Sequence, residues 1–66
     1  MIYNRYWKLR TGIDFFITFI DSKERITTRR GTLIFAGPKS MVFHALRTGT
    51  RFSIPTPSVM EMKEVH

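Results

Sequence analysis

The segment from residue 13 to residue 37, IDFFITFIDSKERITTRRGTLIFAG, constrains the fold of this 66-residue chain more than any other. It contains two apolar, β-branched runs joined by the polar stretch DSKE, which predicts a β-hairpin. Gly31 interrupts the second run, and a glycine inside a strand usually marks a bulge or tight bend. We therefore expect one long second strand that serves two sides of a small barrel. Alternation in the first run predicts a core face made of Ile13, Phe15, Ile17 and Phe19.

Residues 2–10 carry apolar side chains at helical spacing, with basic side chains on the opposite side. This pattern predicts a short amphipathic helix that ends before Gly12. Such a short helix needs a surface to pack on, and we expect it to dock on Phe16 and Ile20, on the second face of the first strand. An extended strand is the alternative for these residues.

Residues 41–47 fit two structures. As a helix over residues 40–48, the segment would begin at the N-cap Ser40 and end near Gly49. As a strand, its apolar side chains alternate, and Thr48-Gly49 becomes a two-residue hairpin turn. We expect the strand, because the neighbouring segments also predict strands. The fold class predicted for residues 1–66 is thus mainly β: a single small five-stranded antiparallel barrel with a short N-terminal helix. A helix at residues 40–48 would instead give an α+β fold.

The end of the chain predicts a proline-containing turn and a last strand. Pro55 and Pro57 cannot continue the strand before them, because proline has no amide hydrogen to donate. The sequence VMEMKEV then alternates, which places Met60 and Met62 on the inner face.

The order of these segments resembles Sm-like and SH3-like small barrels. The resemblance rests on the strands ITFID, TTRRGTLIFAG, SMVFHALR, TRFSIP and VMEMKEV, on Gly31 in the second strand, and on the short IPTPSV connection. It implies the fold and a general inclination toward nucleic acid. Sm-like proteins have a basic residue followed directly by glycine, whereas Arg47-Thr48-Gly49 has an extra residue. No site residue is therefore carried over from the family.

Charge and composition limit the function classes. Eleven basic residues against five acidic ones give a net charge of +6, which attracts nucleic acid, an anionic membrane or an acidic protein surface. No cysteine is present, as is common in a reducing compartment. Asp14 and Thr18 break the first apolar run, and no run approaches the ~20 residues of a membrane span. We therefore expect a cytoplasmic protein with no membrane partner.

Catalytic chemistry has little support in the sequence. His44 and His66 are the only histidines, and the acidic residues show no paired spacing for general acid–base work. There is also no glycine-rich loop that would hold a phosphate. We expect a protein that is not an enzyme and has no metal site and no cofactor.

The basic residues are mostly arginines and occur in groups. The planar guanidinium suits bidentate contacts with phosphate and stacking on bases, and aromatic side chains such as Tyr3 and Phe43 would add stacking faces. We expect the arginines next to Gly31 and those around Thr48-Gly49 to line one rim. The predicted nucleic-acid-binding residues are Arg5, Lys8, Arg10, Arg29, Arg30, Lys39, Arg47, Arg51, Tyr6 and Trp7.

Two functions follow from this pattern. The first is a non-enzymatic barrel that binds RNA or DNA through the phosphate backbone, which is compatible with a homo-oligomer paired through strand edges. The alternative is a small protein-protein interaction module or inhibitor that docks on an acidic partner protein. A simpler interpretation of the same residues is that the charges maintain solubility and prevent edge pairing, while the aromatic residues form the core.

Overall fold

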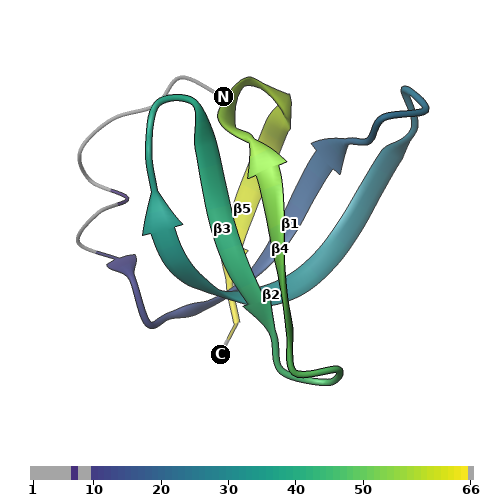
Figure 1. Cartoon of the computed structure of the whole chain (residues 1–66). Helices are drawn as coiled ribbons and strands as arrows, with labels where there is room; N and C mark the ends of the chain where they lie inside the picture. Colours follow the sequence, from purple (N-terminus) through teal and green to yellow (C-terminus); the bar gives the residue numbers. More distant parts are fainter. Residues whose placement is uncertain (1–6, 8–9, 66) are drawn as a thin grey trace.

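The computed structural model describes Trp7 and residues 10–65. One antiparallel sheet contains all five strands in the order β4-β3-β2-β1-β5 (Figure 1). The mainly β, five-stranded antiparallel fold is thus confirmed, and residues 40–45 form a strand rather than the alternative helix. The strands are β1 (Asp14–Ile20), β2 (Ile26–Ala36), β3 (Ser40–Ala45), β4 (Thr50–Pro55) and β5 (Val59–Glu64), with a 3-10 turn, η2 (Thr56–Ser58), between the last two.

The sheet is open, which differs from the predicted closed barrel. β4 and β5 are its two edges, and among the described residues no ladder joins them. Pro55 ends β4 and Pro57 lies in η2, so amide hydrogens are missing where a closing ladder would begin. β5 pairs with β1 instead. Apart from Trp7 and Arg10, the predicted helix at residues 2–10 lies outside the described residues.

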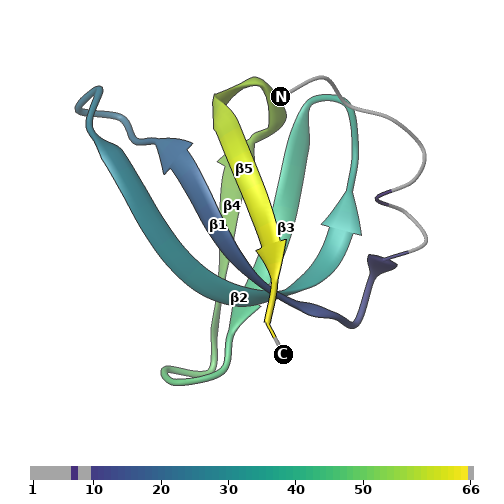
Figure 2. The same cartoon turned by 180° about the vertical axis from the view of Figure 1, so that it is seen from behind.

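Strand β2 is long and curved, and it joins the two halves of the sheet (Figures 1 and 2). Its residues 26–32 pair with β1, and its residues 32–36 pair with β3. The long strand is therefore as predicted, but Gly31 is not its bulge, because it stays in register with Phe15. The register shifts later, between Leu33 and Phe35. This lies just after Thr32, where the partner of β2 changes from β1 to β3.

The core lies on one face of the curved sheet. Phe15, Ile17 and Phe19 are buried as predicted, while Ile13 is only partly buried. On β3, the alternation predicted for a strand is also observed, because Met41 and Ala45 are buried. The buried residues that pack together as the hydrophobic core cluster are Phe15, Ile17, Phe19, Leu33, Ala36, Met41, Phe43, Ile54 and Val59.

The opposite face of β1 is not covered by the described part of the N-terminal segment. Phe16 is 44% exposed and Ile20 is 43% exposed. Trp7 packs instead against Phe15 on the core face, edge to face, with ring centroids 5.8 Å apart. The expected docking on Phe16 and Ile20 is therefore not seen for Trp7, because the indole gains more burial beside the main core.

The alternation predicted for β5 is wrong at its start. Val59 is fully buried, whereas Met60 is 51% exposed and Met62 is partly buried against the core. The cause is a register shift opposite Thr18 and Phe19, where Met60 is the extra residue of a bulge. Because of this bulge, the two side chains that face the core, Val59 and Met62, are three positions apart rather than two.

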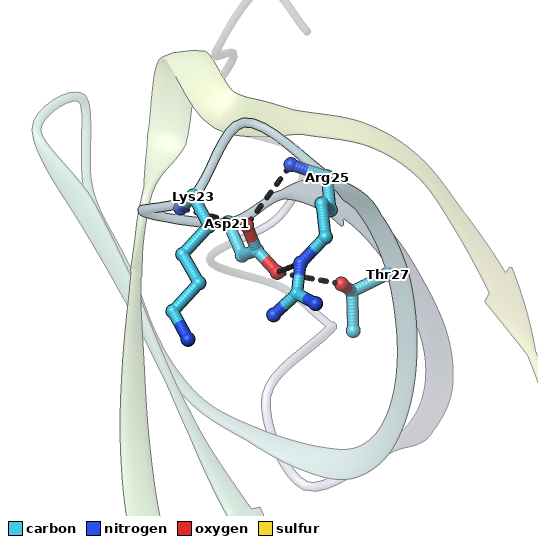
Figure 3. Close-up of polar contacts among 4 residues, drawn as sticks. All are labelled: Asp21, Lys23, Arg25 and Thr27. Atoms are coloured by element: carbon cyan, nitrogen blue, oxygen red, sulfur yellow. Dashed lines mark hydrogen bonds and ion pairs between the residues drawn. The ribbon is translucent and has the colours of Figure 1, made fainter.

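The turn between β1 and β2 is organised by one carboxylate (Figure 3). One oxygen of Asp21 accepts hydrogen bonds from the amides of Lys23 at 2.8 Å and Arg25 at 3.0 Å. The other accepts the hydroxyl proton of Thr27 at 3.0 Å and lies 3.7 Å from the Arg25 guanidinium. These contacts hold Glu24 at a φ of 59°, a left-handed conformation that few residues adopt. The hydrogen bond from the Arg25 amide is the largest cause that lowers the pKa of Asp21.

Asp21→Asn is expected to weaken the fold at neutral pH and to reduce its sensitivity to acid. The folded-state pKa of Asp21 is lowered. The stabilisation that its carboxylate gives the fold is therefore complete above the pKa of the unfolded state, about 3.9, and is lost as the pH falls through the lower pKa of the folded state. Urea denaturation at neutral and acidic pH measures the difference. The variant should be less stable than the wild type at pH 7 and close to it in strong acid. An equal deficit at both pH values would contradict this explanation.

Candidate nucleic-acid interface

Four of the carboxylates each pair with a basic side chain, which lowers the net positive charge where those cations lie. The described basic residues that make no ion pair are therefore of most interest. The ion pairs are Arg10 with Glu64, Arg25 with Asp21, Arg30 with Asp14, and Lys63 with Glu61. The described basic side chains outside these pairs are Lys23, Arg29, Lys39, Arg47 and Arg51.

Arg30 is held by its neighbour across the sheet. Its guanidinium lies 3.3 Å from the Asp14 carboxylate, which also accepts a hydrogen bond from the Thr32 hydroxyl. The Thr32 hydrogen bond and, to a lesser extent, Arg30 lower the pKa of Asp14. Asp14 therefore stays ionised at neutral pH and neutralises much of the charge of Arg30.

A groove of about 640 Å³ opens where β2 separates from the end of β3. The chain does not make the predicted two-residue turn there. It passes through residues 46–49, with the Gly49 amide donating to the Ala45 carbonyl at 2.9 Å and Gly49 at a φ of +70°. The longer turn leaves Leu46 61% exposed and brings Arg47 to the rim. The groove is lined by Arg29, Arg30, Gly31, Ala45, Leu46, Arg47 and Thr48.

The guanidinium of Arg29, which lines this groove, lies over an aromatic ring. Its guanidinium carbon lies 3.9 Å from the centroid of the Phe52 ring. That ring stacks in turn on Phe43, with centroids 5.4 Å apart and an interplanar angle of 22°. Gly31 leaves space for this stack of Arg29, Phe52 and Phe43. A Cβ at Gly31 would lie 3.0 Å from Phe43 Cβ and 3.0 Å from the end of the Phe52 ring.

The structure brings three of the predicted binding residues to one place. Arg29, Arg30 and Arg47 all line the groove, as expected for a rim formed by the Gly31 region and the β3–β4 turn. Arg51 is close in sequence to that turn but pairs with His44 in the ladder. Since it alternates with Phe52, it faces the other side of the sheet.

The remaining predicted residues do not join this group. Lys39 precedes β3 and so lies at the end opposite to the β3–β4 turn (Figure 1). Arg10 pairs with Glu64, and the Trp7 ring packs on Phe15. The residues that lie outside the described part of the chain are Arg5, Tyr6 and Lys8.

Sequence reasoning missed two members of the groove region and misplaced another. Phe43 was expected to offer a stacking face, but it is fully buried. Phe52 and Leu46 were not predicted. The available signal for Phe52 was its alternation with Arg51 on the short strand after the β3–β4 turn, together with Gly31 on β2, which leaves space for a ring. That signal has meaning only once β2 and β4 are known to approach each other.

Among residues 10–65 and Trp7, no cluster of three or more metal-binding side chains is present. No helix in this part of the chain is long and apolar enough to cross a membrane. Comparison with protein-family models, with curated proteins and with solved structures finds no match to this chain.

Proposed function

We propose that this chain is a non-enzymatic nucleic-acid-binding domain that contacts phosphates at the β3–β4 end of its sheet. The observation that carries the proposal is the position of Arg29 and Arg47 on one groove, with no carboxylate of the described residues in an ion pair with either. Arg51 lies at the same end of the sheet, on the outer side of the edge strand β4, and is left for a more distant phosphate. Guanidinium groups spread over one end of the sheet suit a polyanion better than a single small anion.

The distribution of acidic residues supports this orientation. Asp21 and Glu24 lie in the β1–β2 turn, and Glu61 and Glu64 lie on β5, at the sheet edge opposite to β4. Only Asp14, already paired with Arg30, lies near the groove. A polyanion approaching the β3–β4 turn therefore meets an excess of positive charge, which steers its encounter with the protein.

We also propose that the arrangement of the strands is similar to that of Sm-like and SH3-like small barrels. This similarity concerns the fold only. It is supported by the order of the strands, in which consecutive strands pair and the last returns to the first. We also keep the cytoplasm as the proposed location.

A protein-interaction module is the second candidate, because apolar side chains are exposed on the outer face of the β1–β2 hairpin. Ile26 is 68% exposed and pairs with Ile20, which is 43% exposed. Phe16 is 44% exposed on the same face. Such a row is compatible with an acidic partner protein that also carries apolar groups.

The test of the proposed function is binding of fluorescein-labelled oligonucleotides, measured by anisotropy at several salt concentrations. If about three phosphates are contacted, the logarithm of the affinity for a single strand should fall with the logarithm of the salt concentration with a slope of about −2. Arg29→Ala combined with Arg47→Ala should reduce affinity by about tenfold or more at low salt, since each phosphate contact contributes separately.

A matched control removes the same charge elsewhere. Lys23→Ala combined with Lys39→Ala takes away two cations that make no ion pair and do not line the groove. This pair should change the affinity by no more than about twofold. Equal losses in both double variants would show that net charge alone matters. Absence of binding to any oligonucleotide at low salt would overturn the proposal and favour the protein-interaction module.

A further inference from the structure

We propose that the groove accepts an unpaired base, so that the nucleic acid recognised is single-stranded and one base stacks on the Arg29 guanidinium. This inference rests on the proposed function and makes it more specific. It depends on three features of the groove: a planar cation with one covered face, an apolar wall, and a strand edge without a partner.

The planar cation is Arg29. The Phe52 ring covers one face of its guanidinium at 3.9 Å, and Arg29 itself is exposed. Phe43 and Phe52 already form a stack below it. A base on the other face would add one more layer to this column, and guanidinium planes are known stacking surfaces for bases in single strands. Because Phe52 holds the guanidinium in place, little side-chain entropy is lost on binding.

The apolar wall is formed by the start of the β3–β4 turn. Leu46 is 61% exposed although it is a large aliphatic residue, and it lines the groove together with Ala45 and Gly31. A base has two apolar faces, so an aliphatic side chain and a guanidinium plane on the same groove match its surface better than they match a phosphate. Arg47 lies on the same groove and is available for the adjoining phosphate.

The strand edge is that of β2 at Arg30. The Leu33 amide donates to the Ile13 carbonyl at 3.0 Å, so the polar backbone groups of Leu33 point toward the β1 side. These directions alternate along an antiparallel strand, and the amide and carbonyl of Arg30 therefore point the opposite way, toward the groove. Pairing of β2 with β3 begins only at Thr32. Within the described residues no strand covers Arg30 on that side, and its backbone can bond to the edge of a base.

A paired and stacked base in a duplex cannot enter this groove without leaving its helix, which costs a few kcal/mol. An unpaired base has no such cost. The observations therefore favour a single strand over a duplex, and they favour a nucleic acid over an acidic peptide, which would use the arginine charges but not the stacking plane.

The experiment compares three probes of about ten nucleotides: a thymidine oligomer, an oligomer of equal charge built from abasic sites, and a duplex. The thymidine oligomer should bind at least about tenfold more tightly than the abasic one. Arg29→Lys keeps the charge but removes the plane, and it should lower affinity for the thymidine oligomer by about fivefold to tenfold while changing affinity for the abasic oligomer by less than about twofold.

Arg47→Lys is the matched control, because Arg47 is assigned to a phosphate and a lysine can retain that contact. It should leave the preference for thymidine over abasic probe unchanged. Phe52→Leu, checked for folding by circular dichroism, should reduce the preference as Arg29→Lys does.

Four other results would overturn the proposed base site. Equal binding of thymidine and abasic oligomers would overturn the inference while the proposed phosphate contacts stand, and tighter binding of the duplex would do the same. No binding of any probe would overturn both proposals. Equal displacement of the thymidine oligomer by a polyglutamate peptide would indicate an acidic protein partner and overturn the base site.

Discussion

Gly31→Val is expected to destabilise the protein by about 2–3 kcal/mol, which is a large part of the roughly 3–5 kcal/mol that a core of this size supplies. A Cβ at this position would lie 3.0 Å from Phe43 Cβ and 3.0 Å from Phe52 Cζ. The Phe52 ring is partly exposed and can shift, but Phe43 is fully buried in a central strand and cannot. The small gain from replacing a flexible glycine, about 0.5–1 kcal/mol, is therefore outweighed.

Urea denaturation followed by circular dichroism measures this change. Ser53→Val is the matched control, since it adds a branched side chain to an exposed position on β4 and should change stability by less than about 0.5 kcal/mol. Gly31→Ala should fall between the wild type and the valine variant. A valine variant as stable as the wild type would show that β2 and β3 have room to move apart at Gly31.

Thr56→Val is expected to cost about 2 kcal/mol, although it keeps the shape of the side chain. Thr56 is 1% exposed, and its hydroxyl donates to the Gly37 carbonyl at 2.6 Å. Its amide also donates to the Lys39 carbonyl at 3.0 Å. η2 is thereby tied to the β2–β3 turn, and valine would leave the Gly37 carbonyl without its hydroxyl donor in a buried place.

Thr56→Ser separates the hydrogen bond from the packing, because it retains the hydroxyl and loses only a methyl group. It should cost about 1 kcal/mol, so the order of stability is wild type, serine, valine. The free energy of unfolding from urea titrations of the three proteins tests this order. If serine were the less stable of the two variants, packing of the methyl group rather than the hydrogen bond would hold η2 in place.

The strands themselves could be predicted because their signal is local. On β1, apolar side chains at every second position mark the buried face, and Ile17 is fully buried as this period requires. The same rule failed on β5, where Met60 is exposed and Val59 is buried. A bulge there depends on how β5 meets β1, and a period of two cannot reveal an inserted residue.

The grouping of the arginines was only partly predictable. Nearness in sequence to Gly31 and to the β3–β4 turn correctly placed Arg29 and Arg47 on one groove. It gave no sign that Arg30 pairs with Asp14, sixteen positions earlier, or that Arg29 stacks on Phe52. These pairings decide which cations are available to a polyanion.

The sequence by itself determined that most of the chain is extended, which face of β1 is buried, and a surplus of positive charge, because each follows from residue type and short-range period. Tertiary structure decided that the sheet stays open, that Gly31 serves close packing rather than a bulge, and that Arg29 lies on Phe52. The physical reason is that these features arise where the long curved strand β2 meets β3 and β4, and such contacts join residues that are far apart in the chain.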